Sequence, residues 1–135
     1  MALWLFKQEP DCYSFGDLKR DGKTVWDGIS NALALKNLRQ VRRNDRVFFY
    51  HTGKQKAIVG EMRVVGNPRK EAADAKAVVV EVAFVCELTR PVTLAEIKSD
   101  KHLAGWDLVR LPRLSVLPVS EVQWRRVEEL SEKDG

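Results

Sequence analysis

Apolar residues gather in short runs that predict five or six β-strands. Turn-forming and charged residues bound each run. The predicted strands are Leu3 to Lys7, Arg46 to Thr52, Ala57 to Val65, Ala77 to Leu88 and, interrupted by Pro112, Asp107 to Val116. The valine-rich run from Ala77 to Leu88 is the strongest of them, because β-branched residues favour strands. Between the third and fourth strands, Asn67 to Lys76 is predicted to be a charged loop.

Two of these strands carry a more specific pattern. In the strand from Arg46 to Thr52, the set Val47, Phe49 and His51 alternates with Phe48 and Tyr50. Since neighbouring side chains of a strand point to opposite faces, one of these sets is expected to face inward. In the strand from Ala57 to Val65, Gly60 marks a bulge or a close approach of another group to the backbone.

Capping residues mark where helices begin. The predicted helices are Ser14 to Arg20 with Ser14 as cap, Ala32 to Arg42 with Ser30 or Asn31 as cap, and two that open on the capping boxes Thr93–Glu96 and Ser120–Gln123. The last one is expected to end near Leu130. In the second helix, the apolar positions Ala32, Leu35, Leu38 and Val41 predict its buried stripe.

The order of these elements indicates one α+β domain. A chain of 135 residues usually has a single hydrophobic core. No long alternation of strands and helices suggests a parallel sheet, so we expect a curled, mainly antiparallel β-barrel with several short peripheral helices. The domain is expected to span residues 1–130, with a frayed tail at 131–135.

Composition is typical of a folded cytoplasmic protein. The chain is 44% hydrophobic and 31% charged, with a net charge of +4, which permits a nucleic-acid partner without requiring one. Its two cysteines, Cys12 and Cys86, are far apart, so no metal site or redox motif is predicted and no cofactor is implied. No apolar run is long enough to cross a membrane.

The sequence does not predict an enzyme. His51 and His102 are the only histidines, and no nucleophile elbow, zinc motif or phosphate-binding glycine loop is present. His51, at the end of a strand, suits a hydrogen-bonding or ligand-contact role better than that of a general base. His102 follows Asp100 and Lys101 and is interpreted as a solvated loop residue.

Trp26 has two interpretations. It precedes an Asp27-Gly28 turn, and turns lie at the surface, so its indole could be a platform on which a base stacks. Alternatively it is a core residue, as tryptophans usually are at least partly buried. The sequence favours neither. The remaining tryptophans, Trp4, Trp106 and Trp124, are better explained as core residues.

Basic residues concentrate after this turn. The segment from Lys36 to Arg43, which includes Arg42, contains no acidic residue, and Arg46 lies shortly after it. Lys36, Arg39 and Arg43 are therefore candidates for phosphate contacts, although a solvated helix face is the commoner outcome for such a run. Later in the chain, Arg113 and Ser115 lie either on an edge strand or at the rim of the barrel, and both alternatives stay open.

Several motifs, in order, resemble the EVE domain, a family of PUA-like barrels. They are Trp4-Leu5-Phe6-Lys7-Gln8-Glu9-Pro10, Tyr13-Ser14-Phe15-Gly16-Asp17-Leu18, Trp26-Asp27-Gly28-Ile29-Ser30-Asn31, Asn44-Asp45-Arg46-Val47-Phe48-Phe49-Tyr50-His51-Thr52, Pro91-Val92-Thr93-Leu94 and Arg113-Leu114-Ser115-Val116-Leu117-Pro118-Val119. The resemblance covers nearly the whole chain. One departure concerns the pocket directly, because Ser30 stands where the family has an arginine.

The resemblance implies a PUA-like fold that binds DNA carrying a modified cytosine or adenine, with DNA expected ahead of RNA. Transferred by position, the implied pocket residues are Lys7, Ser14, Trp26, Asn31, Tyr50, His51, Arg113 and Ser115. Trp26 would stack on a base taken out of the duplex, while Asn31, His51 and Ser115 would bond to its edge. Lys7 and Arg113 would meet phosphate or sugar. The alternatives are an RNA-binding module of this fold, an enzyme acting on a nucleoside or modified base, and a protein–protein adaptor.

Overall fold

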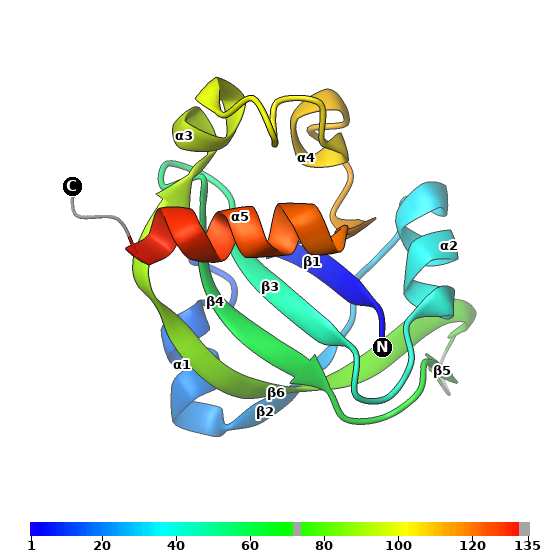
Figure 1. Cartoon of the computed structure of the whole chain (residues 1–135). Coiled ribbons are helices and arrows are strands. Elements are labelled where there is room, and N and C mark those ends of the chain that lie inside the picture. The colour runs from blue at the N-terminus through cyan, green and yellow to red at the C-terminus, as the bar shows by residue number, and fades with distance from the viewer. Residues whose placement is uncertain (72–73, 133–135) are drawn as a thin grey trace.

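The computed structural model describes residues 1–71 and 74–132, which form one curled sheet with helices packed around it (Figure 1). The strands are β1 (Leu3–Gln8), β2 (Lys23–Trp26), β3 (Arg46–His51), β4 (Ala57–Val64), β5 (Arg69–Glu71), β6 (Asp74–Thr93) and β7 (Val116–Pro118). The helices are α1 (Phe15–Asp21), α2 (Ala32–Gln40), α3 (Leu94–Ser99), α4 (Asp107–Arg110) and α5 (Glu121–Glu132). None of the helices in these residues is long and apolar enough to cross a membrane.

The sheet has the strand order β2-β6-β4-β3-β1-β7, with β5 added to β6. Strands β1 and β3 pair in parallel, and the other pairs are antiparallel. This confirms the α+β class and the curled, mainly antiparallel sheet. The path does not close into a full barrel, since β2 and β7 at its ends do not pair with each other within the described strands.

Strand β3 is buried on both faces, so the expectation that only one of its side-chain sets faces the core is wrong. On one face, Phe49 packs edge-on against Phe15 and Trp26, with ring centroids 5.2 and 5.3 Å away. On the other face, Phe48 stacks on Trp124 of α5 at 3.6 Å. Figure 1 shows α5 lying across the sheet in front of β3. The helix therefore adds a second apolar layer that the strand's own alternation does not reveal.

Gly60 in β4 serves both purposes predicted for it. The register between β4 and β6 shifts between Ile58 and Gly60, which is a bulge or irregularity. A Cβ atom at position 60 would also collide with the ring of Phe15. That ring is 4% exposed and lies against Phe49 and Phe84, so it has little room to move. Because residue 60 has no side chain, Phe15 of α1 can pack closely against the sheet.

The helix caps are largely as predicted. Ser14 with Asp17, Thr93 with Glu96 and Ser120 with Gln123 all form reciprocal capping hydrogen bonds. Asn31, and not Ser30, caps α2.

Helix α2 differs in its length and its buried face. It ends at Gln40, two residues before the predicted end, because Val41 is extended. Its buried positions are Ala34 and Leu38, continued by Val41, with Leu35 partly buried and Ala32 exposed. The stripe therefore begins at Ala34 and not at Ala32.

The predicted strand from Asp107 to Val116 is wrong except at its end. Residues Asp107–Arg110 form α4, a turn follows at Pro112 and Arg113, and β7 begins only at Val116. An acidic residue in the first turn favours a helix. Pro112 then disfavours a helical conformation at Leu111, whose φ is −123°. The proline thus terminates a helix where an interrupted strand had been expected.

Two further boundaries differ from the sequence-based expectation. The expected loop from Asn67 to Lys76 contains β5 and the start of β6, while residues 72–73 lie outside the described part. Helix α5 continues through Glu132, and Ser131 is buried with its hydroxyl donating to the Glu128 carbonyl. Residues 131 and 132 are therefore not a frayed tail, and 133–135 are outside the described residues.

Candidate nucleic-acid interface

The turn before β7 is held against the end of β1. The backbone N–H of Lys7 donates to the Ser115 carbonyl at 2.9 Å, and the Lys7 ammonium donates to the Pro112 carbonyl at 2.9 Å. The same ammonium lies 5.5 Å from the ring centroid of Tyr50, which is the β3 partner of Lys7. Lys7 of β1 and Tyr50 of β3 therefore lie near the segment that carries Arg113 and Ser115, and this segment is a turn and not an edge strand.

Burial changes the acid–base behaviour of two of these side chains. Desolvation lowers the pKa of Lys7 from 10.5 to about 8, because a buried ammonium loses its hydration. Desolvation also raises the pKa of Tyr50 to about 12. The Lys7 charge at this position is thus sensitive to mildly alkaline conditions, whereas the Tyr50 phenol stays neutral.

A hollow of about 300 Å³, here called the α2–α4 hollow, lies beside this turn. Its lining residues are Asn31, Leu33, Arg110, Leu111, Pro112, Arg113 and Leu114. Asn31 uses its side-chain oxygen to cap α2, accepting from the Ala34 N–H at 3.0 Å. The amide nitrogen of Asn31 is the half of the side chain that the cap does not use. Asn31 and Arg113, two of the predicted residues, are thus brought together.

Trp26 lines a different hollow of about 320 Å³, the Trp26 hollow. It is lined by Gln8, Cys12, Tyr13, Thr24, Val25, Trp26 and Asp27. The indole itself is 3% exposed and packs against Phe6 and Phe49. The core interpretation of Trp26 is therefore confirmed: the residue also lines an open hollow, but its 3% exposed ring is not a surface platform for stacking. Residues close in sequence contribute to the two hollows: Lys7 bonds to Pro112 of the α2–α4 hollow, and Gln8 lines the Trp26 hollow.

Ser14 and His51 are occupied by the protein itself. The Ser14 hydroxyl accepts from the Asp17 N–H at 3.0 Å. His51 is buried; its Nε2 accepts from the Phe15 N–H at 2.9 Å, and its Nδ1 lies 2.7 Å from the Gln55 side-chain oxygen. This pattern assigns the ring proton to Nδ1. These two side chains fix the start of α1 on β3.

The basic run divides between two faces of the molecule. Lys36, Arg39 and Arg43 are exposed on or just after α2. Arg46 instead forms a paired hydrogen bond with Glu61, at 2.8 and 2.9 Å, and lies over the ring of Trp124. Arg46 is therefore not part of the α2 surface, and a protein carboxylate already balances its charge.

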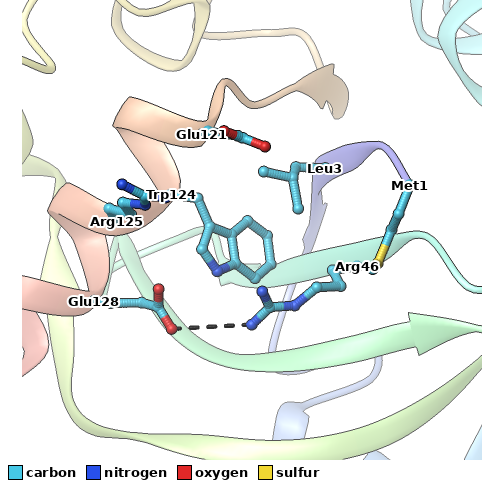
Figure 2. A pocket seen from close by; sticks show the side chains of 7 residues that line it. All are labelled: Met1, Leu3, Arg46, Glu121, Trp124, Arg125 and Glu128. Carbon is cyan, nitrogen blue, oxygen red and sulfur yellow. Dashed lines mark ion pairs between the residues drawn. The ribbon is translucent and has the colours of Figure 1, made fainter.

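Arg46 lines a third hollow of about 360 Å³ beneath α5, with Met1, Leu3, Glu121, Trp124, Arg125 and Glu128. Figure 2 shows the Trp124 indole at its centre, with the Arg46 guanidinium beside it and an ion pair to Glu128 at 3.9 Å. This α5 hollow is the largest of those described here, yet it contains none of the predicted site residues. Its mixed charges also make it a poor match for a polyanion.

Sequence reasoning missed several residues of these hollows. Tyr13 and Thr24 line the Trp26 hollow, and Leu33, Arg110 and Leu111 line the α2–α4 hollow. Exposed leucines at positions 33 and 111 carry no motif, so only the fold reveals that they share a surface.

Nothing in the described residues forms a metal-binding group of three or more histidine, cysteine or acidic side chains. Cys12 and Cys86 are free and exposed.

Comparison with known proteins places this geometry in a family. A sequence model of the EVE domain matches residues 2–130. The chain belongs to the EVE domain family. Human thymocyte nuclear protein 1 is 30% identical to this EVE domain over 167 residues, which cover 97% of the chain and 74% of the human protein.

Solved structures of similar proteins have the same PUA-like fold. The NMR structure of Rpa0253 from Rhodopseudomonas palustris is 33% identical, with a TM-score of 0.93, covering 97% of this EVE domain and 93% of that chain. The crystal structure of human THYN1 protein in complex with 5-methylcytosine containing DNA is 27% identical, with a TM-score of 0.92 and 100% of both chains covered.

Proposed function

We propose that this EVE domain binds DNA that carries a modified cytosine or adenine, and that it does so without catalysing a reaction. The observation that carries the proposal is the full-length structural similarity to human THYN1, which was solved with 5-methylcytosine containing DNA. The local geometry supports it, because the chain forms one hollow lined by Trp26 and Tyr13 and a second lined by Arg110 and Arg113, joined by the short segment from Asp27 to Asn31.

The modified base is proposed to enter the Trp26 hollow. An extruded base offers a flat face and a free Watson–Crick edge. Trp26 and Val25 line the hollow with apolar groups, and the carboxylate of Asp27 can accept from an exocyclic amino group. Cytosine, adenine and guanine carry such a group, whereas thymine does not, so this contact would disfavour thymine and is compatible with the two bases that the family resemblance implies.

The remaining predicted residues are proposed to hold the neighbouring nucleotides. Lys7 and Arg113 supply positive charge beside the Ser115 turn, and Asn31 presents its amide nitrogen to the same hollow. Ser115 and Tyr50 border this position. Lys36, Arg39 and Arg43 add exposed cations on α2 for more distant phosphates.

Ser14 and His51 are proposed to support the site indirectly. Each would have to give up a hydrogen bond within the protein to contact a base. We therefore assign them the positioning of α1, whose preceding segment contributes Cys12 and Tyr13 to the Trp26 hollow. The same commitment of both ring nitrogens argues against His51 as an acid–base catalyst.

Fluorescence anisotropy with labelled oligonucleotides tests the proposal. Otherwise identical strands carry cytosine, 5-methylcytosine, 5-hydroxymethylcytosine, adenine or N6-methyladenine, and each is measured as DNA and as RNA. We expect tighter binding to at least one modified DNA than to its unmodified counterpart. Equal affinity for all modified and unmodified strands would refute base reading, and a consistent preference for the RNA strands would favour the RNA-binding alternative.

Two variants link this result to the site. Asn31→Ser keeps a side chain that caps helices well but removes the amide nitrogen, so it should weaken binding while leaving the fold intact. Arg113→Gln should weaken binding to all strands and reduce the dependence of affinity on salt. The matched control is Lys101→Gln, an exposed cation in the turn between α3 and α4, which should change neither.

A further inference from the structure

The α2–α4 hollow differs in charge from the other hollows described. Its lining contains Arg110 and Arg113 but no carboxylate, and Arg110 forms an ion pair with Asp107 just outside the lining at 3.3 Å. By contrast, Asp27 lines the Trp26 hollow, and Glu121 and Glu128 line the α5 hollow. A fourth hollow, between β2 and β5, includes both Asp27 and Glu71. Of these four hollows, the α2–α4 hollow is therefore the best suited to bind a polyanion.

The same hollow carries two exposed leucines that lie outside the hydrophobic core cluster. Leu33, at the start of α2, is 43% exposed, and Leu111, after α4, is 37% exposed. Pro112 is also exposed at this position, and all three line the hollow. Large apolar side chains that line the same exposed hollow as two arginines are typical of a binding surface.

The place of this pair relative to the Trp26 hollow suggests what it contacts. Asn31 precedes Leu33 by two residues and follows the Asp27-Gly28 turn that borders the Trp26 hollow. On the other side, the Pro112 carbonyl accepts a hydrogen bond from Lys7, whose chain neighbour Gln8 lines the Trp26 hollow. The short connection from Asp27 to Asn31 limits how far the leucines can lie from the hollow in which the base is proposed to bind.

We propose that Leu33 and Leu111 form an apolar wedge that packs against the base stack beside the extruded nucleotide, with Arg110 and Arg113 on the flanking phosphates. Proteins that distort DNA often insert apolar side chains between base steps, because these replace part of the stacking that is lost. This inference rests on the proposed function and adds that the ligand is a duplex that the protein opens.

The wedge makes a prediction that simple strand binding does not. A single strand has no base pair to open, so the leucines should matter less for it. A duplex with a mismatch at the modified position has already lost part of its pairing and should be intermediate. Leu33→Ser and Leu111→Ser are surface changes at exposed positions, and so they should leave the fold intact.

The experiment measures the affinity of the full chain, and of each leucine variant, for a methylcytosine-containing duplex, the same duplex with a mismatch, and the single strand. The variants should lose at least about fivefold in affinity for the matched duplex, with little change for the single strand. A 2-aminopurine placed beside the modified base should brighten on binding of the unmodified protein, and less with the variants. Val122→Ser is the matched control, since Val122 is 65% exposed on α5, away from this hollow.

Three results separate the possible failures. Equal losses for duplex and single strand, or no loss for either, would overturn the wedge while leaving base reading in place. Unchanged 2-aminopurine fluorescence on binding would do the same. If modified and unmodified strands bind equally in every form, the proposed function itself fails and the wedge fails with it.

Discussion

The ring of His51 holds the first residue of α1, because its Nε2 accepts a hydrogen bond from the backbone N–H of Phe15 at 2.9 Å. The first N–H groups of a helix have no partner within the helix. Here a buried side chain from β3 supplies one, and Gln55 fixes the orientation of the ring through Nδ1. The contact joins the helix that carries Phe15 to the central strand of the sheet.

Replacing His51 by alanine should therefore destabilise the fold. The Phe15 N–H would lose its acceptor in a buried setting, which costs about 1–3 kcal/mol in the free energy of unfolding. Urea denaturation measures this change. His102→Ala is the control, since His102 is exposed, and it should shift stability by less than about 0.5 kcal/mol. A variant as stable as the parent, yet unable to distinguish modified bases, would show that His51 acts on the ligand instead.

Gly60 gives a sharper test of packing. Gly60→Ala places a methyl group against the Phe15 ring, which is held between Phe49 and Phe84. We expect a loss of about 1–3 kcal/mol in the free energy of unfolding, as for other overpacked cores. Gly66→Ala is the chemically matched control. The methyl group added at position 66 would meet open space, so the free energy of unfolding should hardly change. Similar stabilities for the two variants, compared by thermal unfolding, would mean that Phe15 can move aside.

Local rules explain why much of the fold could be predicted. A capping box depends on two residues three positions apart, so Ser14–Asp17 and Thr93–Glu96 form as their spacing implies. Gly60 was informative for a similar reason, because a glycine within an apolar strand indicates that a side chain would not fit. The family motifs then placed these elements in the right fold.

The features that could not be predicted depend on contacts between distant segments. Phe48 is buried because α5, at the other end of the chain, brings Trp124 against it. Arg46 does not share the exposed basic surface of α2, because its guanidinium bonds to Glu61 and lies over the ring of Trp124. Trp26 showed the same limit, because only the structure reveals that its indole can be 3% exposed and still line a hollow.

Acid should remove stability through Glu96. The hydrogen bond from Arg90 is the largest cause that lowers the pKa of Glu96 from 4.5 to about 2. Its contribution is therefore present above pH 4.5 and is lost as the pH falls towards 2. Because this ion pair is partly exposed, we expect an effect below about 1 kcal/mol. Glu96→Gln keeps a capping side chain but cannot titrate, so its stability should fall less between pH 5 and pH 2 in urea titrations. Parallel curves for the two proteins would exclude this contribution.

Lys7 should make DNA binding sensitive to mildly alkaline pH. Burial lowers the pKa of this ammonium to about 8 in the folded protein, so its charge is lost as the pH rises from 7 to 9. Losing one cation from a phosphate-binding surface weakens affinity and reduces its salt dependence by about one phosphate contact. The same lowered pKa has the opposite effect on the stability of the fold. The unfolded chain keeps its Lys7 proton up to about pH 10.5, so the contribution of this residue to stability rises with pH between 8 and 10.5.

Lys7→Arg separates these two effects, because a guanidinium stays charged throughout this range. Anisotropy titrations at pH 7, 8 and 9 should show affinity falling for the parent protein and remaining nearly constant for the variant. The free energy of unfolding should change in the opposite direction: as the pH rises, the parent protein should become more stable relative to Lys7→Arg. If the parent's affinity were flat from pH 7 to 9, Lys7 would not contact the phosphate backbone, and Arg113 would carry that contact without it.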